Sequence, residues 1–87
     1  MSDLYEMNPS QIVMYSTTWC SDCRRAKKFF DKQKVNYIDV DIEEDEKGRD
    51  FIMELNDGNR VVPTIVFPDG DVLYEPSTKA LKEKVNV

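Results

Sequence analysis

The sequence predicts an α/β fold in which helices cover both faces of a mixed four-stranded sheet. Short apolar runs, partly β-branched, alternate along the chain with longer segments whose apolar residues recur at helical spacing. A turn sequence, Asp69-Gly70, separates the last two short runs and indicates a hairpin. The predicted order is therefore β-α-β-α-β-β-α. The chain has 87 residues, which suits one domain over residues 1–87 with a core from about 11 to 85.

A β-α-β unit is expected first. Residues 11–15 (QIVMY) form a short apolar run that predicts a buried strand. Residues 20 to about 33 predict a helix, because apolar side chains recur there at helical spacing among cationic ones. These side chains are Cys23, Ala26, Phe29 and Phe30. The alternation in residues 36–42 (NYIDVDI) predicts a second strand with its acids on a solvated face, parallel to the first and joined to it by a right-handed crossover.

The second helix is predicted from an acidic run and an apolar stripe. Residues 43–46 (EEDE) are typical of the charged first turn of a helix. Phe51, Ile52 and Leu55 supply the stripe that would face the sheet. Asp57-Gly58 indicates the helix end.

A hairpin and a last helix complete the fold. Residues 64–67 (TIVF) predict the third strand, and residues 71–74 form the other arm of the hairpin. Ser77 is a suitable N-cap for a helix that ends at about Val85. On that helix Leu81 and Val85 are four residues apart and share one face.

Composition limits the function. The chain has 12 Lys and Arg against 17 Asp and Glu, a net charge of −5, which argues against a nucleic-acid partner. Its start lacks the basic and apolar segments of a secretory signal, and it shows no membrane segment, so we expect a cytoplasmic monomer. It has no histidine, which excludes histidine acid–base catalysis and the commonest metal ligand.

Cys20 and Cys23 are the only cysteines, and they allow three interpretations. A structural disulfide is rare in the cytosol, and closing a four-residue loop removes only about 2 kcal/mol of unfolded-state entropy. A zinc site usually needs four ligands, so carboxylates or a second chain would have to complete it. A redox dithiol fits the position best, because a CxxC pair lies where a strand leads into a helix.

The position also suggests separate roles for the two thiols. Cys20 would lie exposed at the helix start, where the dipole stabilises a thiolate by about 0.3–2 kcal/mol. A fall in thiol pKa from about 8.5 to about 6 needs roughly 3.4 kcal/mol. Direct N–H bonds, the Cys23 thiol or Arg24 must therefore add to the dipole, while Asp22 would oppose it if close. Cys20 is expected to be the nucleophile and Cys23, facing the core, the resolving thiol.

The sequence Val61-Val62-Pro63-Thr64 precedes the third strand. Proline suits the start of a strand, and a trans bond is the usual state of an isolated X-Pro pair. The alternative is a cis bond beside the dithiol, with the N–H and C=O of Val62 free to pair with an extended substrate. Trp19 is expected either to contact substrate and shield the thiolate or to pack on the first helix.

Together these motifs resemble the glutaredoxin family of the thioredoxin fold, and within it the mycoredoxin-like proteins. The resemblance rests on WCxxC after the first strand, VVP after the second helix and the Asp-Gly hairpin, and covers residues 11 to 85. It implies a sheet order of 2-1-3-4, a catalytic pair Cys20 and Cys23, and a cis Pro63. It also implies that Trp19, Arg60, Val62 and Pro63 bind the substrate or thiol.

The resemblance implies a small thiol–disulfide oxidoreductase that serves electron transport and cell redox homeostasis. Its substrates would be protein disulfides or mixed disulfides with a small thiol, with no bound cofactor or metal. The chain lacks three features of glutathione-using members: it has Thr17 in place of a basic residue, Ser21-Asp22 in place of Pro-Tyr, and residues 74–77 (YEPS) in place of paired glycines and an acid. The electron donor therefore stays open between glutathione, mycothiol, another low-molecular-weight thiol and thioredoxin reductase. The alternative function is an iron–sulfur cluster-binding module.

Overall fold

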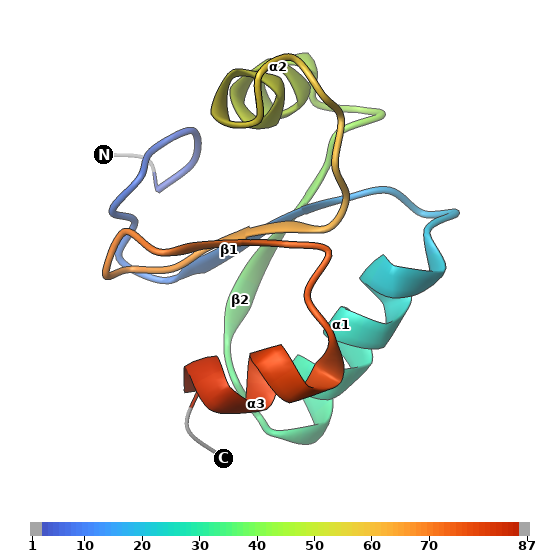
Figure 1. The fold of residues 1–87 in the computed structure, drawn as a ribbon, viewed down its shortest axis with the longest axis vertical. Coiled ribbons are helices and arrows are strands. Elements are labelled where there is room, and N and C mark those ends of the chain that lie inside the picture. Colours follow the sequence, from blue (N-terminus) through green and yellow to red (C-terminus); the bar gives the residue numbers. More distant parts are fainter. Residues whose placement is uncertain (1–2, 86–87) are drawn as a thin grey trace.

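The computed structural model describes residues 3–85 and gives the predicted order of elements (Figure 1). The ends of the elements differ from the predicted ends by up to three residues. Within the described range the elements are β1 (Ile12–Ser16), α1 (Ser21–Lys32), β2 (Tyr37–Asp41), α2 (Glu46–Leu55), β3 (Thr64–Val66), β4 (Val72–Tyr74) and α3 (Thr78–Val85).

The four strands form one mixed sheet in the order β2-β1-β3-β4, as the resemblance implies. β1 and β2 are parallel, with Ile12 opposite Tyr37. β3 runs antiparallel to β1, with Tyr15 opposite Thr64, and β4 runs antiparallel to β3. The central strand β1 is thus paired on both edges and leads directly to the cysteine pair.

The sheet separates the helices into two layers, with α1 and α3 on one face and α2 on the other (Figure 1). Successive residues of β1 point to opposite faces, so Met14 packs toward α1 and α3 while Val13 and Tyr15 pack toward α2. The core on the α1 and α3 side consists of Met14, Ala26, Phe29, Phe30, Ile65, Phe67 and Leu81. The core on the α2 side consists of Val13, Tyr15, Val40, Ile42, Ile52 and Val66.

The start of α2 differs from the prediction. Residues 42–44 form a turn, and only Glu46 of the acidic run belongs to the helix. Asp45 is the N-cap, and its Oδ1 accepts hydrogen bonds from the N–H groups of Lys47 at 3.2 Å and Gly48 at 3.3 Å. A Cβ at Gly48 would lie 2.9 Å from Val40 Cγ1, so the glycine lets α2 approach the sheet closely.

The segment before β1 also contributes to the fold. Leu4 and Tyr5 pack against the α2-side core, and Pro9 is fully buried. The Tyr5 N–H donates to the Tyr15 hydroxyl at 2.9 Å, and the Tyr5 hydroxyl donates to Asp45 Oδ2 at 2.5 Å. Residues before position 11 therefore pack against the core, although the core was expected to start at residue 11.

The last helix is fixed at both ends. Ser77 Oγ accepts a hydrogen bond from the Ala80 N–H at 3.1 Å, in agreement with its predicted capping role. Lys84 Nζ lies 2.5 Å from Asp69 Oδ2 and 2.9 Å from Asp71 Oδ2, which ties α3 to the turn between β3 and β4. None of the helices in the described range is long and apolar enough to cross a membrane.

Candidate active site

The cysteine pair lies at the end of the sheet where β1 and β2 both finish. Residues 17–20 follow β1, Glu43 follows β2, and residues 60–63 lead into β3. Because β1 and β2 are parallel, their carboxyl ends lie at the same end of the sheet, which brings these segments together. The fold therefore places Trp19, Cys20, Arg60, Val62 and Pro63 in one region, with Cys23 on the first turn of α1.

Cys20 is the N-cap of α1. Its Sγ accepts a hydrogen bond from the Cys23 N–H at 3.1 Å, which is a direct N–H bond of the kind expected to stabilise a thiolate. The same sulfur lies 3.8 Å from the carbonyl oxygen of Val62. Cys20 is only 8% exposed, so the expectation of an exposed thiol is wrong. Its sulfur is enclosed between the helix end and the segment before β3.

Cys23 is fully buried beneath Cys20. Burial is the main cause that raises the pKa of the Cys23 thiol, to about 12, and its hydrogen bond with Cys20 adds to the rise. Both residues are free thiols. Cys23 therefore stays protonated at neutral pH.

The charged residues of the first turn have other partners. Arg24 Nη1 donates to the Thr18 carbonyl at 3.3 Å, and so holds the loop that leads into α1. Asp22 pairs with Arg25 at 3.0 Å, which offsets its negative charge near the helix start. Of the groups expected to support a Cys20 thiolate, the structure thus places the Cys23 N–H and the Cys23 thiol in hydrogen-bond contact with the Cys20 sulfur.

The peptide bond between Val62 and Pro63 is cis, as the resemblance implies. The Val62 carbonyl faces Cys20 Sγ, and the Val62 N–H donates no hydrogen bond within the described part of the chain. Pro63 is buried, and its carbonyl accepts a hydrogen bond from the Glu75 N–H at 2.9 Å.

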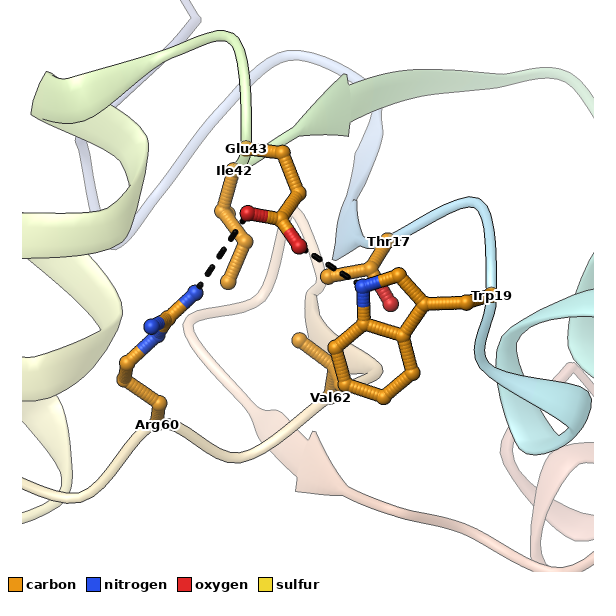
Figure 2. A pocket seen from close by; sticks show the side chains of 6 residues that line it. All are labelled: Thr17, Trp19, Ile42, Glu43, Arg60 and Val62. Carbon is orange, nitrogen blue, oxygen red and sulfur yellow. Dashed lines mark hydrogen bonds and ion pairs between the residues drawn. The ribbon is translucent and has the colours of Figure 1, made fainter.

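A pocket of about 280 Å³ opens beside this segment (Figure 2). It is lined by Thr17, Trp19, Ile42, Glu43, Arg60 and Val62. Trp19 is 65% exposed, and its indole N–H donates to Glu43 Oε1 at 2.6 Å. The other carboxylate oxygen, Glu43 Oε2, lies 3.9 Å from Arg60 Nη2. Trp19 thus belongs to the pocket wall and is held there by its hydrogen bond to Glu43.

One polar atom of this pocket has no partner. Thr17 is 1% exposed, and its hydroxyl makes no hydrogen bond within residues 3–85. Buried hydroxyl groups are nearly always paired, so this unpaired hydroxyl is an energetic cost to the fold beside the pocket.

Glu43 is the charged pocket residue that the sequence prediction missed. It was assigned to a solvated first helical turn, whereas it bonds to Trp19 and faces Arg60 (Figure 2). The signal that could have found it is the predicted parallel β-α-β unit. In such a unit the first residues after each strand meet at one edge of the sheet.

The described residues contain no group of three or more His, Cys, Asp or Glu side chains arranged to hold a metal ion. The two sulfurs are the reactive groups of the site. A pair of thiols, one capping a helix and one buried beneath it, can be oxidised to a disulfide and reduced again.

Comparison with known proteins gives one consistent result. A family model described as glutaredoxin matches residues 12–73. Mycoredoxin 1 of Corynebacterium glutamicum is 37% identical over 76 residues, which cover 87% of this chain and 94% of that protein. A protein of Mycobacterium tuberculosis whose name assigns it to the glutaredoxins is 37% identical over 79 residues, which cover 91% of this chain and 94% of that protein.

Solved structures show the same fold at lower sequence identity. A glutaredoxin from Archaeoglobus fulgidus is similar with a TM-score of 0.77 at 23% identity, covering 100% of this chain and 98% of its own. A thioredoxin-like protein, solved as a point mutant, has a TM-score of 0.79 at 24% identity and covers 90% and 97% of the two chains.

Proposed function

The chain belongs to the glutaredoxin family and is a thiol–disulfide oxidoreductase, and we propose that Cys20 is its nucleophile and Cys23 its resolving thiol. The observation that carries this assignment is the hydrogen bond from the Cys23 N–H to Cys20 Sγ at 3.1 Å, above a Cys23 thiol that is fully buried. The helix start directs its N–H groups at the first sulfur, while burial keeps the second protonated.

The reaction proceeds in two exchanges. The Cys20 thiolate attacks one sulfur of a substrate disulfide, the substrate S–S bond breaks, and the departing substrate thiolate takes a proton from solvent. Cys23 then attacks Cys20 Sγ, which forms the Cys20–Cys23 disulfide and releases the second substrate sulfur. Cys23 gives up its proton in that step, and the leaving thiolate is the group that accepts it. The substrate gains two electrons and the protein loses two.

Val62 and Pro63 present an extended substrate to Cys20. The Val62 carbonyl is 3.8 Å from Cys20 Sγ, and the N–H of the same residue has no partner within the described range. A substrate backbone that pairs with Val62 would therefore lie alongside the reacting sulfur.

A low-molecular-weight thiol returns the protein to its dithiol form. Glutathione, mycothiol and related thiols can each do this by the reverse pair of exchanges, and thioredoxin reductase is the alternative donor. We place the reaction in the cytoplasm, where reducing thiol pools keep such a pair available, and expect the protein to act as a monomer on disulfide-containing proteins. No feature of the described site favours the iron–sulfur module.

The assignment of roles is tested with serine variants and insulin as a disulfide substrate. Cys23→Ser leaves the first exchange intact, so the variant should accumulate as a mixed disulfide through Cys20, visible by mass spectrometry. Cys20→Ser, the matched control, should form no adduct. Release of fully reduced insulin by Cys23→Ser without an added reductant, or an adduct on Cys23 in the Cys20→Ser protein, would contradict the proposed roles.

The donor is identified by coupling the oxidised protein to NADPH consumption. Glutathione with its reductase, mycothiol with its reductase, and thioredoxin reductase are supplied in turn. Oxidation of NADPH with one small-thiol couple and not with thioredoxin reductase alone is the expected result. Reduction by thioredoxin reductase alone would reject a small-thiol donor.

A further inference from the structure

The pocket beside Cys20 has one cationic and one anionic side chain, and they are paired with each other. Arg60 Nη2 lies 3.9 Å from Glu43 Oε2. Glu43 is held from the other side by Trp19, whose indole N–H donates to Oε1 at 2.6 Å. Figure 2 shows the carboxylate between the two side chains. The charge of Arg60 is thus already balanced by a carboxylate of the chain itself.

The pocket is close enough to Cys20 to receive a small group bound to that sulfur. Val62 lines the pocket, and its carbonyl oxygen lies 3.8 Å from Cys20 Sγ. Trp19, which also lines the pocket, directly precedes Cys20 in the chain. A volume of about 280 Å³ suits the substituents of a small thiol better than a folded protein.

The remaining polar group of the pocket is uncharged. Thr17 is buried, and its hydroxyl has no hydrogen-bond partner among residues 3–85. That oxygen is closed off from solvent, so the polar groups that a ligand can reach in the pocket are those of Trp19, Glu43 and Arg60. Ile42, Val62 and the ring of Trp19 provide the apolar walls.

We propose that Glu43 determines which thiol the site accepts. Because Glu43 forms an ion pair with Arg60, thiols with uncharged amide or hydroxyl substituents enter the pocket, and thiols with a free carboxylate are disfavoured. This inference rests on the proposed function, because it concerns the group that becomes joined to Cys20. Glu43 is a specificity-determining residue and takes no part in the exchange of disulfide bonds.

The discrimination comes from like-charge repulsion. A carboxylate that enters the pocket either displaces Glu43 from Arg60 or lies near a second negative charge. The side chains of Arg60 and Glu43 are 46% and 45% exposed, so solvent reduces the effect. We therefore expect about tenfold discrimination, which corresponds to about 1.4 kcal/mol.

The test uses two disulfides that differ in charge, those of N-acetylcysteine and of N-acetylcysteine amide. In the Cys23→Ser background, the Cys20 thiolate attacks a probe sulfur, the probe S–S bond breaks, and one probe thiolate leaves and takes a proton from solvent. The rate of adduct formation is followed by mass spectrometry. Adding Glu43→Gln keeps an oxygen for the Trp19 N–H but removes the charge. It should lower the amide-to-acid rate ratio about tenfold.

The matched control is Glu44→Gln, because Glu44 is exposed and does not line the pocket. It removes the same net charge and should leave the ratio unchanged. An unchanged ratio in Glu43→Gln, or an equal change in Glu44→Gln, would overturn the selection by Glu43. Failure of both probes to modify Cys20 in every variant would instead overturn the proposed function, so the two failures are distinguishable.

Discussion

The Thr17 hydroxyl is the residue-scale feature with the clearest energetic consequence. It is buried without a partner in the described part of the chain, and such a group costs about 1–3 kcal/mol of folding free energy. Thr17→Val keeps the shape and removes the hydroxyl. We expect the variant to be more stable by about 1 kcal/mol in urea unfolding.

The control for this change is Thr18→Val. Thr18 is exposed, so its hydroxyl is open to water and the substitution should change stability by less than about 0.5 kcal/mol. A Thr17→Val protein that is less stable than the wild type would show that the hydroxyl is satisfied in solution.

Individual residues were predictable where a local pattern determines them. The spacing of Cys20 and Cys23 at the start of a helical pattern was enough to place one thiol at the helix start and the other facing the core. The burial of Cys20 was not predictable, because it depends on the Val62 segment, which is 42 residues away in the chain. The role of Glu43 depends on long-range contacts with Trp19 and Arg60 in the same way.

At the scale of elements, α2 is anchored to the segment before β1 through Asp45. The carboxylate of Asp45 caps α2 and also accepts the hydrogen bond from the Tyr5 hydroxyl at 2.5 Å. That bond is the main cause that raises the pKa of Tyr5 from 10.0 to about 12. This hydrogen bond thus adds a polar link to the packing of the N-terminal segment against α2.

This link predicts a pH-dependent difference between the wild type and Tyr5→Phe. Below pH 10 the phenol is protonated in both the folded and the unfolded state, so the wild type should be more stable by about 1 kcal/mol. As pH rises from 10 to about 12, the unfolded chain loses the proton before the folded one does, so the advantage should disappear. Urea unfolding of both proteins at pH 7, 9 and 11 measures it.

Tyr74→Phe is the control, because the Tyr74 hydroxyl lies 3.4 Å from the Leu55 carbonyl and bonds to no carboxylate. Its stability difference from the wild type at pH 7 should be smaller than that of Tyr5→Phe. A constant difference for Tyr5→Phe between pH 7 and pH 11 would reject the link to Asp45.

Elements were predictable to the extent that periodicity defines them. The apolar spacing of α1 and the alternation of β2 gave ends within one residue of the observed ones. The start of α2 was placed too early, because four consecutive acids suit both a helical first turn and a turn with an N-cap. The choice depends on the contacts of Asp45 and Glu43 with distant residues, which local sequence does not contain.

At the scale of the whole molecule, Lys84 joins the last helix to the hairpin. Its ammonium group lies within 2.9 Å of Asp69 and Asp71. The Lys84 bond holds the pKa of Asp69 below its ordinary value of 3.8, and Asp69 raises the pKa of Lys84 above 10.5. The lowered carboxyl pKa stabilises the fold above pH 3.8 and loses this effect in acid. The raised ammonium pKa stabilises it below pH 10.5 and loses this effect in base.

Lys84→Met should therefore lower the melting temperature at neutral pH, and the difference from the wild type should shrink at 1 M salt and below pH 3.8. Lys82→Met is the control. Lys82 is exposed on the same helix and forms no ion pair within the described residues, so its melting temperature should not differ from that of the wild type. A salt-independent loss in Lys84→Met would indicate that packing over Phe67 matters more than charge.

Two of the three strand pairings in the sheet were predictable from general rules. A right-handed β-α-β unit places β1 and β2 side by side, and a tight turn pairs β3 with β4. The position of β3 against β1 came only from the family resemblance. The packing of residues 3–10 was not foreseen, because Pro9 and Tyr5 show no periodic pattern, and Tyr5 adopts a φ of 62°.

Trp19 is the only tryptophan in the chain, and it forms part of the pocket wall. The indole fluorescence of this protein therefore originates at the redox site alone. A change in emission on adding a thiol reports events within the pocket, without any attached dye. A thermal transition followed by the same emission reports when the hydrogen bond between Trp19 and Glu43 breaks. The unfolding of the sheet has to be followed separately, by circular dichroism.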